Sequence, residues 1–192
     1  MKKIPNILCI IRIALIPFIL LFALNNHVSA LIEPWARWLI SGIIFGLAMI
    51  TDLFDGKIAR KYDAITDLGK FLDPIADKLL VICIFIAFIE LDLVLAIPVI
   101  LIIAREFFVT GLRLAAASKG VVVAANYWGK AKTMTQGVSL GISFAAMLLS
   151  YLINENISSV LRIIPSLLSW VCAAITVISA ISYWNQCKQY LK

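Results

Sequence analysis

Residues 52–78 read "DLFDGKIARKYDAITDLGKFLDPIADK" and hold eleven of the 28 charged residues in the chain, although long apolar runs flank the segment on both sides. The whole chain has 192 residues, is 62% hydrophobic and has a mean hydropathy of +1.01. Because only 15% of its residues are charged, they cannot cover the surface of a soluble domain of this length. The composition therefore predicts a membrane protein, with this charged segment joining the ends of two apolar helices.

Six apolar runs are long enough to cross a bilayer, which takes roughly 17–25 helical residues. They are Ile7–Leu24, Trp35–Leu53, Phe71–Ile89, Leu93–Ala117, Met134–Ile153 and Ile163–Trp184. We therefore expect an all-α integral membrane protein of six transmembrane helices, forming one membrane domain over residues 1–192. Arg12 and Pro17 interrupt the first run, which leaves open an interfacial helix at the N-terminus.

The basic residues predict how these helices cross the membrane. An even number of spans places both termini on one side, and fifteen of the 17 Lys and Arg residues then lie on that side, against Arg37 and Arg162 on the other. Cytoplasmic loops carry an excess of basic residues, so we expect both termini and the charged segment at the cytoplasmic face. The net charge of +6 suits anionic headgroups, and no basic–aromatic pattern points to a nucleic-acid partner.

Small residues inside the apolar runs predict close contacts between helices. Gly42 and Gly46 are four residues apart, as are Gly137 and Gly141, which is the spacing that allows helices to approach closely in lipid. The four cysteines have no metal-ligand spacing, and we expect them to pack as small apolar residues. They are Cys9, Cys83, Cys172 and Cys187.

Two pairs of aspartates flank the charged segment. Asp52 and Asp55 are three residues apart at the end of the second run, and Asp73 and Asp77 are four apart at the start of the third. Either spacing places both carboxylates on one face of a helix. Because the connection is short, we expect the two helices to be antiparallel neighbours and the pairs to converge. Four carboxylates form a set of hard oxygen donors suited to Mg²⁺, Mn²⁺ or Ca²⁺.

The cost of these carboxylates favours a metal site. One aspartate at the centre of a membrane helix costs ~2.5–3.5 kcal/mol, so four unpaired ones would cost on the order of 10 kcal/mol. A position near the interface lowers that cost, but their mutual repulsion still requires positive charge. Two divalent cations would supply it. For Asp63 and Asp67 the alternative of a solvated loop residue or a helix cap stays open.

Small residues beside the aspartates indicate room for a ligand. Gly56 and Gly69 lie next to the two carboxylate pairs, where a missing side chain lets a ligand approach the backbone. Ala59 lies about one turn beyond Gly56 and keeps the same face bare. Arg60 supplies a guanidinium that can pair with a phosphate. Together these residues predict a slot for a diphosphate.

The segment fits the pattern D-x2-D-G-x2-A-R-x8-G-x3-D-x3-D at every fixed position from Asp52 to Asp77, and it resembles the signature of the CDP-alcohol phosphotransferases. These are integral membrane enzymes of phospholipid synthesis, usually homodimers of six-helix subunits with a site that faces the cytoplasm. The resemblance implies that two divalent cations, Mg²⁺ or Mn²⁺, bind to Asp52, Asp55, Asp73 and Asp77. It implies that the CDP moiety binds to Asp55, Gly56, Ala59, Arg60 and Gly69, and that Asp77 is also the general base.

Basic residues in the fourth and fifth runs point to an acceptor that carries a phosphate. Arg105 and Arg113 are eight residues apart, nearly on one helix face, and Lys130 and Lys132 precede the fifth run. Arginines embedded in a membrane are expensive, so a nearby anion is expected. Glu106 is an alternative partner for one of the arginines, and lipid headgroups are an alternative for the lysines.

Four further strings resemble one branch of that family, the phosphatidylglycerophosphate synthases: "PNILCIIRI", "GKFLDPIADKLL", "AREFFVTGLR" and "NYWGKAKTMTQ". This resemblance implies that CDP-diacylglycerol reacts with glycerol 3-phosphate in a bacterial cell membrane, giving phosphatidylglycerophosphate and CMP. Inositol phosphate, or phosphatidylglycerol as in cardiolipin synthesis, is an alternative acceptor. A cation transporter is the alternative from another class, but it predicts carboxylates near the middle of the membrane.

Overall fold

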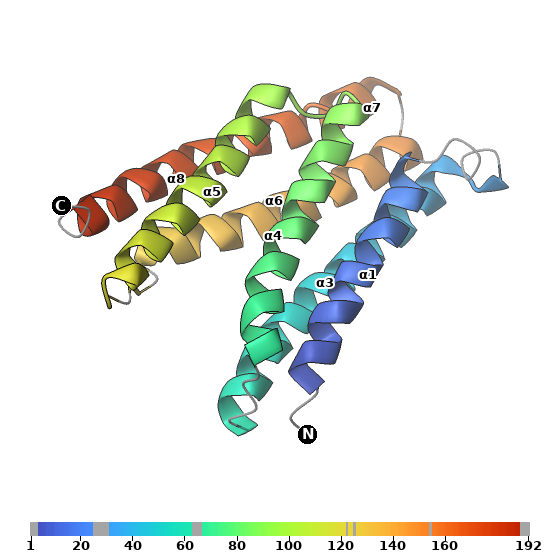
Figure 1. The fold of residues 1–192 in the computed structure, drawn as a ribbon. Coiled ribbons are helices and arrows are strands. Elements are labelled where there is room, and N and C mark those ends of the chain that lie inside the picture. Colours follow the sequence, from blue (N-terminus) through green and yellow to red (C-terminus); the bar gives the residue numbers. More distant parts are fainter. Residues whose placement is uncertain are drawn as a thin grey trace.

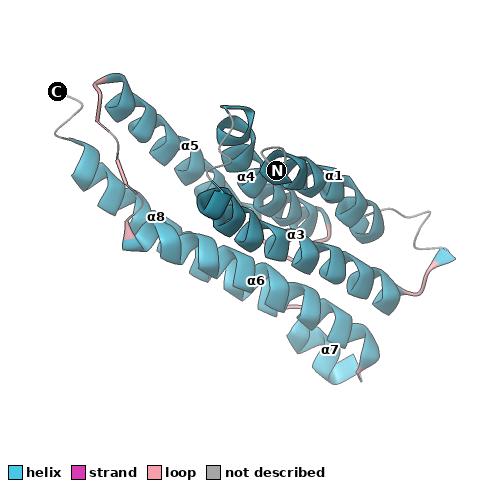
Figure 2. Ribbon diagram, turned by 90° about the horizontal axis from the view of Figure 1, so that it is seen from below, coloured by secondary structure: helices cyan, strands magenta, loops and turns pink. Residues whose placement is uncertain are grey.

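The computed structural model describes residues 4–24, 31–62, 67–121, 123–124, 126–153 and 155–188, and within them the side chains of residues 4–8, 52–62, 67–74, 77 and 155–156 lie outside the description. The helices are α1 (Ile4–Leu24), α3 (Pro34–Tyr62), α4 (Asp67–Glu90), α5 (Ala96–Ser118), α6 (Tyr127–Leu152), α7 (Glu155–Leu161) and α8 (Ile164–Cys187). The described residues contain no strand (Figure 2). The prediction of an all-α fold is confirmed.

The long helices form two groups that meet along α3 and α6 (Figure 1). In one group, α1 packs against both α3 and α4. In the other, α8 packs against both α5 and α6, and Figure 1 shows α8 beside α5. Helix α6 therefore has one face toward α3 and another toward α8.

Three stretches of the described residues are long and apolar enough to cross a membrane: Pro34–Thr51 in α3, the whole of α6, and Ile157–Cys187, which covers most of α7 and α8. Residues Cys9–Leu24 of α1 form a shorter apolar helix. Large apolar side chains are exposed along the long helices, as expected of surfaces that contact lipid. These features support an integral membrane protein, while the number of six spans and the orientation of the termini stay predictions.

Several helices extend beyond the apolar runs that predicted them. Helix α3 continues past Leu53 to Tyr62, and α6 begins at Tyr127 rather than near Met134. A hydropathy pattern ends at the first charges, whereas backbone hydrogen bonding continues into polar sequence. At α6 the start is set by Asn126, whose Oδ1 accepts a hydrogen bond from the backbone N–H of Gly129 at 2.7 Å and so caps the helix. Helix α7 lies in the segment that was expected only to connect two spans.

The ends of α4 and α5 share one backbone motif. After α4, Asp92 has a φ of +57° and donates its backbone N–H to the carbonyl of Ile89, while Leu93 donates to Phe88. After α5, Gly120 has a φ of +77° at the equivalent position, with the same pattern of hydrogen bonds. This left-handed closure satisfies the last carbonyls of each helix and turns the chain sharply.

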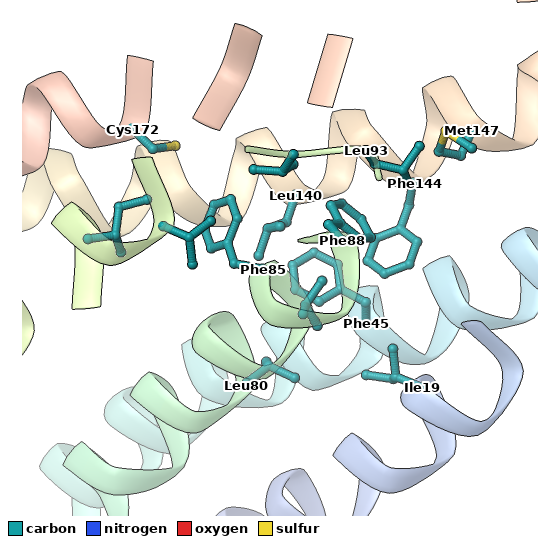
Figure 3. Packing of buried hydrophobic residues seen from close by; sticks show 14 of the residues in the cluster. Ile19, Phe45, Leu80, Phe85, Phe88, Leu93, Leu140, Phe144, Met147 and Cys172 are labelled. Atoms are coloured by element: carbon teal, nitrogen blue, oxygen red, sulfur yellow. The ribbon is translucent and has the colours of Figure 1, made fainter. Parts of the chain in front are cut away.

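Aromatic rings fill the contact between the two groups of helices (Figure 3). The ring of Phe144 on α6 has its centroid 5.3 Å from that of Phe45, 5.4 Å from that of Phe88 and 6.0 Å from that of Trp38. These side chains come from α3, α4 and α6 and are all buried. The ring of Phe144 is therefore shared by three helices.

The glycines explain how closely α3 approaches α6. A Cβ added to Gly42 would lie 3.3 Å from Cβ of Phe144, and one added to Gly137 would lie 2.5 Å from Cε of Met49. The prediction of close contact is confirmed for these two positions. A Cβ at Gly46 or Gly141 would meet no described atom within 4 Å, so that role does not extend to the other member of each pair.

The cysteines behave as expected. All four are free thiols, and Cys9, Cys172 and Cys187 are buried, while Cys83 is half-buried. Their role as small packing residues is consistent with this burial.

Candidate active site

The structure describes the backbone around the four aspartates. Asp52 and Asp55 lie in the last part of α3, and Asp73 and Asp77 lie in the first part of α4. Both segments are continuous helix, so each pair shares a helix face as its spacing predicts. The side chains lie outside the described part of the structure, so the convergence of the four carboxylates stays a prediction.

The connection between the helices limits how far the pairs can be separated. Residues 63–66 join Tyr62 at the end of α3 to Asp67 at the start of α4. A chain of this length spans roughly 18 Å at most. The ends of the two helices therefore lie no farther apart than this.

The donor set fits a divalent cation. Four carboxylates provide only hard oxygen ligands, which suits Mg²⁺ or Mn²⁺. Among the side chains that the structure describes, no three His, Cys, Asp or Glu residues come together as a metal site. The aspartate pairs thus remain the candidate ligands. The residues predicted for CDP lie on the same two helices, also with side chains outside the description: Gly56, Ala59 and Arg60 on α3 and Gly69 on α4.

A buried ion cluster lies where α5 meets α6. Arg105 and Glu106 on α5 and Lys132 on α6 are only 8%, 6% and 7% exposed. The Oε1 atom of Glu106 forms a salt bridge with Nζ of Lys132 and lies 3.4 Å from Nη1 of Arg105. One carboxylate oxygen therefore contacts two cations from two helices.

Helix α8 holds Arg105 from the other side. The Nη2 atom of Arg105 donates a hydrogen bond to Oγ of Ser179 at 2.6 Å, and its guanidinium lies 5.5 Å from the ring centroid of Tyr183. The hydroxyl of Tyr183 in turn accepts a hydrogen bond from the backbone N–H of Asn126, whose side chain donates to Oγ of Ser182. Two turns of α8 thus position both the arginine and the cap of α6.

The lysine that directly follows the aspartate motif reaches the same cluster. Lys78 follows Asp77 directly on α4, and its Nζ donates to Oγ1 of Thr110 on α5 at 2.7 Å. Thr110 donates its own hydroxyl proton to the backbone carbonyl of Glu106 at 2.7 Å. The segment that carries Asp77 is therefore linked to the buried ions.

Among the side chains that the structure describes, the cluster has an excess of positive charge. Lys78, Arg105 and Lys132 are three cations, and Glu106 is the single carboxylate that the described side chains place among them. Two positive charges therefore lack a described counter-ion. Buried charges are expensive unless they are paired. The two buried cations, Arg105 and Lys132, share one carboxylate, so this arrangement suits an additional anion such as a phosphate monoester.

The structure separates the four residues predicted to bind the phosphate of the acceptor. Arg105 and Lys132 come together at Glu106, whereas Arg113 on α5 and Lys130 on α6 are exposed. Sequence reasoning considered Glu106 only as a partner for an arginine and did not assign Lys78. The position of Lys78 beside Asp77 was an available signal. Ser179 and Tyr183 offered no signal, because their contacts join residues far apart in the chain.

The comparisons with known proteins agree with the motif. A model of the CDP-alcohol phosphatidyltransferase family matches residues 2–182. A Rickettsia typhi protein named CDP-diacylglycerol–glycerol-3-phosphate 3-phosphatidyltransferase is 44% identical, over 99% of each chain. A Bacillus subtilis protein of the same name is 41% identical, over 100% of this chain and 98% of its own. One from Mycoplasma genitalium is 34% identical, over 100% of this chain and 86% of its own.

Proposed function

The chain belongs to the CDP-alcohol phosphatidyltransferase family, and we propose that it transfers the phosphatidyl group of CDP-diacylglycerol to glycerol 3-phosphate, releasing phosphatidylglycerophosphate and CMP. The names of the relatives that it matches over nearly their whole length support this activity. The structural observation that carries the choice of acceptor is the buried, positively charged cluster at Glu106.

The cluster supplies the binding energy for the acceptor. Arg105 and Lys132 hold the phosphate of glycerol 3-phosphate, and the exposed Arg113 and Lys130 attract it toward them. A dianionic phosphate balances the charge that Glu106 leaves uncompensated. A neutral acceptor such as serine would leave that charge unpaired, so the cluster favours a phosphorylated polyol.

The reacting group lies next to this binding site in the chain. Asp77 accepts the proton of the acceptor hydroxyl, and the hydroxyl oxygen attacks the phosphorus of the phosphatidyl group. The new P–O bond forms as the P–O bond to CMP breaks, and CMP leaves. Lys78 and Thr110 orient this part of α4 against α5. Because a carboxylate is a weak base for an alcohol, positioning provides most of the acceleration.

The aspartate motif supplies the site for the nucleotide. Two divalent cations, Mg²⁺ or Mn²⁺, would be held by Asp52, Asp55, Asp73 and Asp77, and when bound they would neutralise charge on the diphosphate. The CDP moiety would be held by Asp55, Gly56, Ala59, Arg60 and Gly69. The hard oxygen donors and the small residues on the ends of α3 and α4 support both assignments.

The membrane setting follows from the same observations. We assign the chain to one membrane domain over residues 1–192 with six spans, with both termini and the active site at the cytoplasmic face of a bacterial cell membrane. The distribution of basic residues and the six apolar runs of the sequence support this arrangement. The resemblance to the family supports a homodimer.

An acceptor panel tests the proposal. The purified protein in mixed detergent–lipid micelles receives CDP-diacylglycerol and one acceptor at a time: glycerol 3-phosphate, inositol phosphate, phosphatidylglycerol or serine. We expect CMP release with glycerol 3-phosphate, loss of that release on chelation with EDTA, and recovery on addition of Mg²⁺ or Mn²⁺. Faster release with another acceptor would replace the proposed substrate, and no release with any of them would remove the enzyme assignment.

A further inference from the structure

A row of polar side chains continues from the buried cluster into the contact between α6 and α8. On α6 the row is Lys132, Gln136 and Ser139, and on α8 it is Cys172, Thr176 and Ser179; all six are buried. Both sets have spacings of four and three residues, which place each set on one helix face. Helices α6 and α8 pack together. The two sets are joined directly at one end, and at the other end they are joined through Arg105 and Glu106 of α5.

The contacts at the two ends of the row enclose Gln136 on α6 and Thr176 on α8. Cys172 contacts Oγ of Ser139 at 3.2 Å. At the other end, Ser179 accepts from Arg105, which shares Glu106 with Lys132. Gln136 lies between Lys132 and Ser139 on α6, and Thr176 lies between Cys172 and Ser179 on α8, so both residues lie between these two sets of contacts.

Three buried polar atoms along this row have no hydrogen-bond partner among the described residues. Nε2 of Gln136, Oγ1 of Thr176 and Nε of Arg105 are buried and make no hydrogen bond with the part of the chain that the structure describes. Gln136 is 2% exposed and Thr176 is fully buried. Leaving a buried donor unsatisfied costs about 1–3 kcal/mol. Three such atoms, one each from α5, α6 and α8, belong to the row that begins at the buried cations Arg105 and Lys132, and they point to a polar ligand that completes the site.

We propose that Gln136 is a further acceptor-binding residue, whose side-chain amide donates a hydrogen bond to an oxygen atom of the phosphorylated acceptor. This inference rests on the proposed function, since it takes its ligand to be the acceptor held by Arg105 and Lys132. Gln136 lies one turn from Lys132 on the same buried face. A phosphate oxygen and a polyol hydroxyl are both suitable acceptors for the amide.

The test compares two substitutions on α6. Gln136→Met keeps the length of the side chain and removes the donor. Ser143→Ala is the matched control, because Ser143 is also buried but already donates to the carbonyl of Ser139 at 2.7 Å. We expect Gln136→Met to raise the KM for glycerol 3-phosphate by about tenfold, the value of one hydrogen bond, with the KM for CDP-diacylglycerol unchanged. The control is expected to leave both constants unchanged.

Inhibition by inorganic phosphate distinguishes the two oxygen sources. Weaker inhibition of Gln136→Met by phosphate assigns the hydrogen bond to the phosphate group, and unchanged inhibition together with a raised KM assigns it to a hydroxyl. An unchanged KM for glycerol 3-phosphate would overturn the inference and leave water as the partner of the amide.

A second variant covers loss of folding. Gln136→Asn keeps the amide but withdraws it by one methylene, and a raised KM for glycerol 3-phosphate is again expected. The activity of the wild-type protein shows whether a negative result removes only the role of Gln136 or also the proposed function. CMP release by the wild type together with an unchanged KM in both variants removes only the role of Gln136, whereas a wild type inactive with glycerol 3-phosphate removes both.

Discussion

The two faces of α6 differ in what they contact. Toward α3, Gly137 lies against Met49, and Phe144 packs among aromatic rings. Toward α5 and α8, Lys132 and Gln136 are buried beside a carboxylate and unpartnered polar atoms. One helix therefore joins an apolar contact to a polar one.

The difference between the two faces of α6 suggests different roles: one face holds the helices together, and the other binds a ligand in the proposed function. Helices in lipid gain little hydrophobic energy from meeting, so their association depends on close van der Waals contact, which the α3 face provides. Buried charges oppose assembly unless they are paired. On the α8 face Lys132 is paired with Glu106 of α5, and the proposed acceptor would add a second anion there. Substitutions on the two faces should therefore change different measurements.

The largest loss of activity is expected for substitution of the proposed general base, and it serves as the reference for the other variants. Asp77→Ala should abolish turnover, because no base remains for the acceptor hydroxyl, while leaving CDP binding and thermal stability nearly unchanged. CMP release and nucleotide binding by calorimetry measure the two effects. Normal turnover in this variant would remove the assigned role of Asp77.

Removing a cation beside the polar face of α6 should have the second largest effect. Arg105→Ala removes a buried charged hydrogen-bond donor, and we expect kcat/KM for glycerol 3-phosphate to fall roughly 100-fold. Arg37→Ala is the matched control, since the hydrogen bonds that Arg37 forms with the described residues go to the backbone carbonyls of Phe22 and Ala23. Steady-state kinetics with varied glycerol 3-phosphate make the comparison. Equal losses in both variants would mean that Arg105 serves structure alone.

The apolar face should respond in stability. Phe144→Ala removes the ring shared by three helices and should lower the free energy of unfolding by about 3 kcal/mol. Phe107→Ala, at a site 72% exposed, should change it little. Unfolding in detergent with increasing denaturant measures both. The folded Phe144→Ala protein should retain the wild-type KM for glycerol 3-phosphate, and a raised KM would show that the two faces are coupled.

The smallest changes in stability are expected at two glycines of α3, and they should have opposite signs. Gly42→Ala adds a methyl group 3.3 Å from Cβ of Phe144 and should destabilise the protein by about 1 kcal/mol. Gly46→Ala enters open space and should stabilise α3 by up to about 1 kcal/mol, because alanine favours helix over glycine. Thermal unfolding of the two variants side by side tests this difference. The same sign of change in both would contradict the close approach at Gly42.

Helical spacing explains why part of the candidate site was readable from the chain. The pairs Asp52/Asp55 and Asp73/Asp77 depend only on helix geometry and a short connection, so local sequence predicts them. The cationic residues show the limit. Arg105 and Arg113 carry the same charge and lie nearly on one face of α5, yet Arg105 is buried against α8 whereas Arg113 is exposed. Their difference depends on which neighbouring helix covers each position.

The sequence by itself determined the helical membrane character, the aspartate motif and the family, because hydropathy, helical periodicity and fixed motif spacing are properties of neighbouring residues. Only the tertiary structure decided that Glu106 bridges Arg105 and Lys132, that Lys78 reaches Thr110, and that Nε2 of Gln136 is buried without a hydrogen bond to the described residues. These contacts join helices that are distant along the chain. Their existence depends on which helix faces meet, and no local pattern specifies that pairing.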